Sequence, residues 1–268
     1  MNKARTKKPS PAAAGRTRPA KRGRKPPRRS GLARLRRACG RILLLLLAAG
    51  LVVPLALVLL LRWVPPPTTA FMLRDELAAA NRTAETERMP YRWTPWEDIA
   101  PQAAVAVIAS EDQKFPDHHG FDVEAIRMAL GDALQGGRLR GASTISQQTA
   151  KNLFLWPGRT LFRKGLEAYL TVLIELCWSK QRIVEVYLNI AEFGNGVFGI
   201  TAASERFFGK RPAELTADEA ALLAAVLPYP SGWRVDDPSR RVRRRQAWIR
   251  AQMTQLGGVA LIEARIGG

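Results

Sequence analysis

The sequence is poor in the residues that build metal sites and covalent cross-links. Its 268 residues include two cysteines, Cys39 and Cys177, and two histidines, the adjacent pair His118 and His119. No CxxC or HExxH pattern occurs, so a zinc site is not expected. The topology predicted below places the two cysteines on opposite sides of a membrane. No disulfide framework is therefore predicted, and Cys177 is expected to be a small core residue.

The first 41 residues contain no acidic side chain. They hold sixteen of the 42 lysines and arginines, which leaves 26 basic against 23 acidic residues in the rest of the chain, so most of the net charge of +19 belongs to this segment. We predict a disordered basic tail over residues 1–41. Nucleic acid is one conceivable partner for such a tail. Its position directly before a hydrophobic run favours a membrane role instead, and nucleic acid is not expected.

The run from Ile42 to Leu61 lacks any charged side chain. At about 1.5 Å per residue, such a helix spans roughly 30 Å, the thickness of the hydrocarbon core of a bilayer. Trp63 follows where an interfacial aromatic residue is expected. A signal peptide is the alternative, but three prolines follow in place of a cleavage site with small residues. We predict an uncleaved transmembrane helix over residues 42–62, with the basic tail in the cytoplasm.

Strand signals are scarce after the membrane span, and apolar residues recur at helical spacing. The clearest stripe consists of Leu166, Tyr169, Leu170, Leu173, Ile174 and Cys177. Helices are predicted over about residues 101–110, 123–135, 144–153, 161–178, 180–189, 217–227 and 239–264, with Ser143 as the N-cap of the third. A linker over residues 63–95 would lead into a mainly α domain over residues 96–268.

The sequence also lacks the usual nucleotide cradles, because neither GxxxxGK[ST] nor GxGxxG occurs. Ser143 and Ser146 have no evident histidine partner for a serine hydrolase. What remains are carboxylates near basic and amide side chains. Glu111-Asp112 ends an apolar helix, where burial raises a carboxyl pKa toward the range of acid or base catalysis. A solvated acidic pair at a helix end is the alternative.

Two further segments carry polar clusters. Thr144, Gln147 or Gln148, and Lys151 fall on one helical face, and the helix start near Ser143 offers free N–H groups to an anion. A polar face in water is the alternative. Arg163 and Lys164 lie one helical turn from Glu167, an arrangement that is also typical of ordinary surface ion pairs.

Five segments in order resemble the motifs of the bacterial peptidoglycan glycosyltransferases of family 51. Glu111-Asp-Gln-Lys-Phe115-Pro-Asp-His118-His-Gly120 resembles EDxxFxxHxG, residues 141–152 resemble GxSTxxQQxxKN, and residues 163–167 resemble RKxxE. Residues 180–189 resemble KxxIxExYxN, and residues 207–210 with 215–224 resemble the fifth motif. Ser146 stands where threonine is common and keeps the hydroxyl. The chain ends soon after these motifs, so the monofunctional, membrane-anchored form is expected.

The resemblance implies a lysozyme-like helical fold and a glycan-chain polymerase. The growing lipid-linked chain would pass to the GlcNAc 4-hydroxyl of lipid II, with a β-1,4 bond, inversion and release of undecaprenyl pyrophosphate. Glu111 would be the catalytic base and Glu167 the second catalytic carboxylate. The residues implied in substrate binding are Asp112, Phe115, His118, Ser143, Thr144, Gln148, Lys151, Asn152, Arg163 and Lys164. Glu185 and Tyr187 are expected to be mainly structural.

The same resemblance implies cofactors, partners and a location. A divalent cation, Mg²⁺ or Mn²⁺, would be held by Glu167 and the substrate pyrophosphate, while no nucleotide, haem or structural zinc is expected. The expected partners are lipid II, the lipid-linked glycan, the bilayer and cell-wall synthesis or division proteins. The catalytic domain would lie outside the bacterial inner membrane.

The apolar residues 153–156 and 161–162 are expected to enter the membrane interface, with core packing as the alternative. The rival functions are a muramidase or lytic transglycosylase on the same scaffold and a catalytically inactive membrane scaffold. The cationic set around residues 151–164 favours the polymerase, because a finished glycan strand carries no pyrophosphate.

Overall fold

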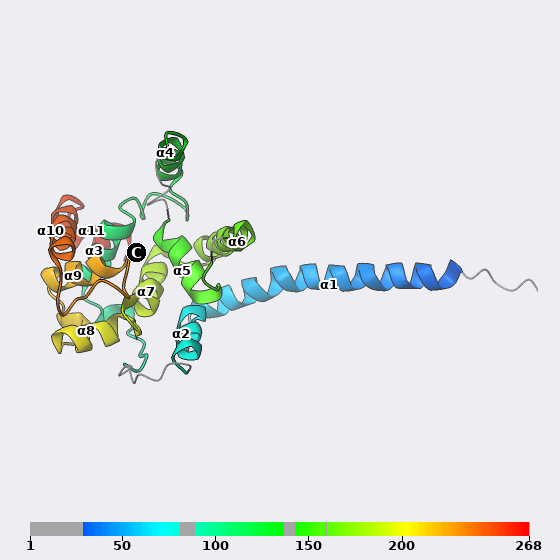
Figure 1. Ribbon diagram of the computed structural model, residues 1–268, viewed down its shortest axis with the longest axis horizontal. Coiled ribbons are helices and arrows are strands. Elements are labelled where there is room, and N and C mark those ends of the chain that lie inside the picture. The colour runs from blue at the N-terminus through cyan, green and yellow to red at the C-terminus, as the bar shows by residue number, and fades with distance from the viewer. Residues whose placement is uncertain (1–28, 81–88, 137–142, 159, 268) are drawn as a thin grey trace, which may run out of the picture. The chain divides into compact units, whose positions relative to one another are not determined.

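The computed structural model describes residues 29–80, 89–136, 143–158 and 160–267, and it confirms the mainly helical class (Figure 1). The chain divides into two compact units, Met1–Ala49 and Gly50–Gly268. The helices are α1 (Arg29–Leu61), α2 (Ala70–Ala80), α3 (Pro101–Glu111), α4 (Val123–Leu134), α5 (Ile145–Phe154), α6 (Leu161–Cys177), α7 (Lys180–Ile190), α8 (Ile200–Phe208), α9 (Ala217–Val226), α10 (Arg240–Gln255) and α11 (Ala260–Arg265). Two 3-10 turns, η1 (Trp96–Asp98) and η2 (Pro212–Glu214), complete the helical part.

Helix α1 contains the predicted membrane span. Within the described part of the chain, it is the one helix long and apolar enough to cross a bilayer. It begins at Arg29, so residues 29–41 are helical where a disordered tail is predicted. Leucine, alanine and arginine are good helix formers, and a helix already nucleated by the span extends through them. The rest of the predicted tail, residues 1–28, lies outside the described residues.

The core of the second unit forms around α3. Every residue of α3 from Ala103 to Ala109 is buried, as is every residue of α9 from Ala220 to Val226. A helix that is apolar on all sides must be enclosed by other elements. Helix α3 packs against α7, α9, α10 and α11, and its alanines allow the neighbouring helices to approach closely. Its C-terminal residue Glu111 is thereby carried to the edge of this core.

Helix α7 joins this core to a second group of helices. It packs against both α3 and α5, and α5 packs against α6. The one sheet in the described residues is a short antiparallel hairpin of β1 (Glu192–Gly194) and β2 (Val197–Phe198), in which Glu192 pairs with Phe198. Gly199 follows the hairpin with φ +86°, and a Cβ there would lie 2.6 Å from the backbone oxygen of Asn189, so only glycine fits.

The part of α1 that belongs to the second unit is tied to α6 and α7. The Trp178 indole N–H donates to the backbone oxygen of Val58 at 2.7 Å, and the Tyr169 hydroxyl donates to that of Leu51 at 3.2 Å. Arg182 donates to the backbone oxygen of Leu61 at 2.8 Å. Val58 is completely buried by these neighbours. These three hydrogen bonds link the end of the apolar span to α6 at Leu51, to Trp178 after α6 at Val58 and to α7 at Leu61.

The structure differs from the sequence prediction at three helices. Helices α2 and α8 are not predicted. The single helix predicted over residues 239–264 is wrong, because Gly257 and Gly258 take positive φ values of 92° and 60° and separate α10 from α11. These conformations suit glycine and end a helix.

Candidate functional site

Glu111 lies at the end of α3 and is held from two sides. Its Oε2 atom accepts a hydrogen bond of 3.0 Å from Nε2 of Gln148 in α5. Its Oε1 atom accepts one of 3.2 Å from Nη2 of Arg245 in α10. Its side chain is 13% exposed, so one edge of the carboxylate remains open to solvent. Gln148, which the resemblance implies in substrate binding, therefore lies beside Glu111.

The environment of Glu111 raises the pKa of its carboxyl group above the ordinary value of 4.5. Burial at the end of an apolar helix is the largest cause, because it disfavours the charged form. The hydrogen bond from Gln148 and the positive charge of Arg245 oppose this effect. A carboxylate with a raised pKa binds a proton more readily, which is the property that a general base needs.

Asp112 points away from solvent and links residues 112–120, the part of the first motif that follows α3, to α5. His118 Nδ1 accepts from the Gly120 N–H at 3.2 Å, so Nε2 carries the proton and donates to Asp112 at 2.9 Å. The Asp112 Oδ2 atom also accepts from the backbone N–H of Ile145 at 3.0 Å, at the start of α5. Asp112 and His118 therefore fix the position of the adjacent Glu111.

Phe115 supports the same loop from inside. Its side chain has no exposed surface, and its ring meets that of His118 edge to face. The Lys180 ammonium lies 4.3 Å from the centre of the Phe115 ring and donates to the backbone oxygen of His118 at 2.6 Å. Phe115 was expected to bind substrate, but in this structure its ring is enclosed by protein.

The second motif begins with a capping box at Thr144. Its hydroxyl donates to the Gly120 backbone oxygen at 2.7 Å, and Gln147 completes the box at the N3 position. The predicted N-cap, Ser143, is wrong by one residue, because Thr144 and not Ser143 has a glutamine three positions on. Ser143 is instead exposed and lines the same cavity as Glu111, where it can meet a ligand.

The third motif forms a buried ion-pair cluster in the first turns of α6. Glu167 is 3% exposed, and its Oε2 atom accepts from Nη1 of Arg163 at 2.9 Å. Its Oε1 atom accepts from the ammonium of Lys164. Arg163 is itself 8% exposed, and its Nε–H has no hydrogen-bond partner among the described residues. Arg163 therefore retains a donor for a further acceptor, whereas both oxygens of Glu167 are engaged.

Lys151 stands between the two carboxylates. Burial lowers the pKa of its ammonium group below 10.5, and both Glu167 and Glu111 oppose that shift. Its charge therefore acts on both acidic side chains, and it also lies 5.7 Å from the centre of the Phe71 ring. The next residue, Asn152, has a buried Oδ1 atom without a hydrogen-bond partner. The structure thus gathers the cations of the second and third motifs.

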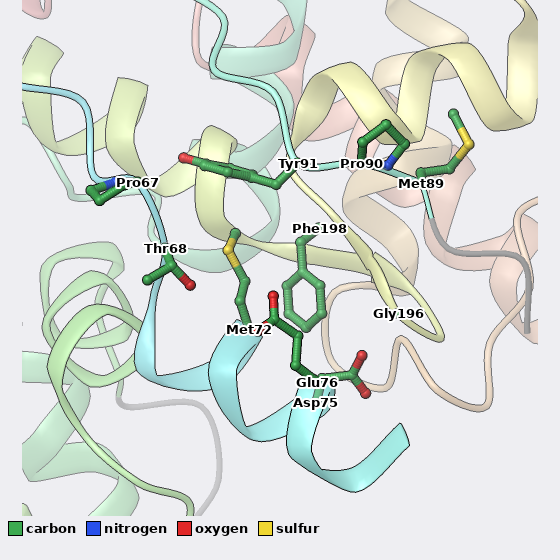
Figure 2. A pocket seen from close by; sticks show the side chains of 10 residues that line it. All are labelled: Pro67, Thr68, Met72, Asp75, Glu76, Met89, Pro90, Tyr91, Gly196 and Phe198. Carbon is green, nitrogen blue, oxygen red and sulfur yellow. The ribbon is translucent and has the colours of Figure 1, made fainter. Parts of the chain in front are cut away.

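A cavity of about 220 Å³ opens beside the Glu111 carboxylate. It is lined by Glu111, Asp112, Gln113, Lys114, Asp122, Ala125, Met128, Ser143 and Thr144. A second cavity, of about 300 Å³, lies between α2 and the β1–β2 hairpin (Figure 2). Met72, Asp75 and Glu76 enter it from α2, and Phe198 from the hairpin. Only the first cavity includes a predicted catalytic residue.

Two residues close to Glu111 are missing from the predicted site. Arg245 belongs to an arginine-rich stretch of α10, and nothing in that composition separates it from its exposed neighbours Arg243 and Arg244. Tyr187 was expected to be structural, yet its hydroxyl donates to Oε1 of Gln148 at 3.2 Å. Arg245 follows the buried Val242 by three residues and precedes the buried Ile249 by four, so all three lie on one face of α10. This spacing is the one sequence signal that Arg245 points inward.

Comparison with known proteins identifies the family of this chain. The family model described as Transglycosylase matches residues 78–254. The chain is 58% identical over 202 residues to a biosynthetic peptidoglycan transglycosylase of Stutzerimonas stutzeri, covering 75% of this chain and 83% of that protein. It is 54% identical to the protein of the same name from Pseudomonas entomophila, over 80% of this chain and 89% of that protein. A third, from Xylella fastidiosa, is 48% identical over 84% and 92%.

The family match extends from the end of α2 into α10, so it includes every motif described above. These similarities confirm the resemblance, the enzyme class and the biosynthetic activity that the five motifs imply. The chain therefore belongs to the Transglycosylase family.

Proposed function

We propose that Glu111 is the general base with which this peptidoglycan glycosyltransferase extends glycan chains from lipid II. The carboxylate would take the proton of the GlcNAc 4-hydroxyl as that oxygen attacks the anomeric carbon of the lipid-linked chain. The single observation that carries this assignment is a buried, hydrogen-bonded carboxylate with a raised pKa at the wall of a cavity.

The cationic cluster suits the leaving group. As the anomeric carbon–oxygen bond breaks, negative charge collects on the departing lipid pyrophosphate, and fixed positive charge stabilises that state. Lys151, Lys164 and the free Nε–H of Arg163 lie near Glu167 and can meet phosphate oxygens. Glu167 then keeps these cations in place. Glu167 accepts hydrogen bonds from Arg163 and Lys164 at once, which suits a residue that positions these two cations.

The residues do not fit a resident divalent cation. The described part of the chain contains no group of three or more acidic, histidine or cysteine side chains that could hold a metal ion, and both Glu167 oxygens face cationic side chains. We expect Mg²⁺ or Mn²⁺ to arrive bound to the substrate pyrophosphate, whose oxygens suit hard cations. Glycan synthesis with and without added metal would test this expectation.

We also propose that α6 lies in the outer leaflet of the membrane, where the lipid of the substrate is anchored. Tyr169 of α6 donates to the backbone oxygen of Leu51, near the middle of the apolar span, and Trp178 just after α6 donates to that of Val58. Helix α6 therefore lies at the depth of the outer half of the span. Leu161 and Phe162 at its start are 92% and 71% exposed, and Trp156 is 50% exposed. Exposed apolar side chains at that level suit a bilayer interface. Leu153 and Leu155 are buried, so core packing holds for that part of the predicted segment.

The orientation rests on charge. Arg34, Arg36, Arg37 and Arg41 precede the apolar run, and basic residues beside a span favour the cytoplasmic side. The catalytic domain would then face outward at the inner membrane. Association with other cell-wall synthesis or division proteins stays a prediction from the family resemblance.

Glu111→Gln tests the assigned base. Loss of a general base reduces turnover by about 10²- to 10⁴-fold, so polymerisation of purified lipid II by the full chain should nearly stop. The circular dichroism spectrum should remain that of the parent protein. A Glu111→Gln enzyme that polymerises at the parental rate would overturn the assignment.

The membrane contact has its own test. The protein used for this test lacks residues 1–49, which form the first compact unit. In this protein, replacing Trp156 and Phe162 by serine should weaken association with lipid vesicles. The matched control replaces two other exposed aromatic residues, Tyr229 in the turn after α9 and Trp248 of α10. Equal binding by the parent and the Trp156/Phe162 variant would remove the proposed contact.

A further inference from the structure

The catalytic carboxylate is fixed by residues outside the motif that supplies it. Arg245 lies on α10, which packs against α3. One guanidinium nitrogen, Nη2, donates both to the Ser110 backbone oxygen at 3.3 Å and to Oε1 of Glu111 at 3.2 Å. The same group therefore binds the last turn of α3 and the side chain that leaves it. With 27% of its side chain exposed, Arg245 is partly buried.

Tyr187 fixes the other side of Glu111 through Gln148. The Tyr187 side chain is 1% exposed, and its hydroxyl donates to Oε1 of Gln148 at 3.2 Å. An amide whose oxygen is held in this way must turn its NH₂ group in the other direction. That NH₂ group donates to Oε2 of Glu111 at 3.0 Å. The amide thus presents a donor, and not an acceptor, to the carboxylate.

We propose that Arg245 and Tyr187 are positioning residues of the polymerase, which hold the Glu111 carboxylate ionised and correctly aimed, Arg245 directly and Tyr187 through the Gln148 amide. The inference rests on the proposed role of Glu111 as the base. It assigns to α10 and α7 a function that the first three motifs do not contain. Neither residue needs to touch the sugar for this function.

The charges around Glu111 explain why such help is needed. The charged or titratable groups that face it are Arg245 from α10, Lys151 from α5 and Tyr187 from α7, and Asp112 follows it directly in the chain. Burial disfavours the ionised carboxylate, whereas a base must be ionised before the substrate arrives. Arg245 is the cation whose side chain makes a hydrogen bond to Glu111, and Lys151 acts at longer range.

The two contacts also leave a path for the proton. When the sugar hydroxyl enters, its oxygen attacks the anomeric carbon and its proton passes to one Glu111 oxygen while the bond to the pyrophosphate breaks. The remaining oxygen keeps its partner, so the carboxylate does not rotate away. Holding the acceptor atom within hydrogen-bond reach is the geometric requirement for general base catalysis.

Arg245→Met tests the direct contact. A hydrogen bond to a charged group supports the ionised form strongly, so we expect kcat at pH 7 to fall about ten- to hundredfold and the acid limb of the pH–rate profile to move to higher pH. KM for lipid II should change little, and Arg245→Lys should restore part of the rate. Arg243→Met changes an exposed arginine of the same helix, so it is the matched control and should keep the parental pH–rate profile.

Tyr187→Phe tests the contact through Gln148. It keeps the buried ring and removes only the hydroxyl, so kcat should fall about two- to tenfold with a smaller shift of the acid limb in the same direction. An unmoved acid limb in both variants, or a loss confined to KM, would overturn the positioning role. Glu111→Gln distinguishes failure of the base assignment from failure of the positioning role. If that variant is active, the base assignment fails. If it is inactive while Arg245→Met behaves as the parent, only the present inference fails.

Discussion

Two buried carboxylates in this enzyme stand in opposite surroundings. Glu111, at the end of α3, faces one amide and one guanidinium, and burial dominates and raises its pKa. Glu167, one turn into α6, is enclosed by Arg163 and Lys164 on its own helix, with one cation on each oxygen. A buried carboxylate whose negative charge is only partly balanced by neighbouring cations can bind and release a proton. A carboxylate paired with two cations serves as their counter-charge.

On the proposed assignment, the two halves of the reaction are divided between two groups of helices that share α5. The proton would be accepted where the end of α3 meets side chains of α5 and α10. The phosphate would be bound where α5 packs on α6. Lys151 of α5 carries a charge that acts on both halves. Substitutions of Glu111 and of Glu167 should therefore differ in their effects on stability and on turnover.

The largest difference is expected in stability. Glu167→Gln leaves the buried Arg163 without its counter-charge, so the free energy of unfolding should fall by about 3–5 kcal/mol. Glu111→Gln should act in the opposite direction at neutral pH. A raised folded-state pKa means that the folded protein binds more protons than the unfolded chain, so ionised Glu111 opposes folding once the pH exceeds that pKa. Thermal unfolding of both variants measures the contrast, and equal losses would contradict it.

The next difference is expected in the pH dependence of turnover. The acid limb should lie above pH 4.5, because Glu111 must lose its proton to act and its pKa is raised. The alkaline limb should lie below pH 10.5, because Lys151 has a lowered pKa and loses its charge early. Lys151→Arg keeps the charge at every pH, so it should extend activity to higher pH without moving the acid limb. Rates of lipid II polymerisation between pH 5 and pH 10 give both limbs.

The smallest expected effect concerns Lys164. Its side chain is 48% exposed, so its ion pair with Glu167 is partly screened by solvent. Lys164→Ala should lower the free energy of unfolding by about 1 kcal/mol or less, while its loss of a phosphate contact should raise KM for lipid II. A stability loss as large as that of Glu167→Gln would show that Lys164 and Arg163 contribute equally to the buried cluster.

The sequence predicted the helices that carry the motifs, because their signals are local. Thr216 and Glu219 form the capping box that starts α9, as their spacing indicates. The same rule applied at Thr144 and Gln147 would have given the correct N-cap of α5. Helix α8 is less evident, since it follows Gly199 without a capping side chain. Its end at Gly209, in the left-handed conformation, is the signal that was available.

What the sequence determined by itself is the apolar run long enough to span a membrane, the helical class and the motifs that contain Glu111 and Glu167, since each depends on composition or on residues close in the chain. Only the tertiary structure decided what surrounds Glu111. Gln148, Tyr187 and Arg245 lie 37, 76 and 134 positions away from it along the chain. Helical periodicity shows which face of a helix is buried but not which helix covers it, so the partners of a buried charge follow only from the packing.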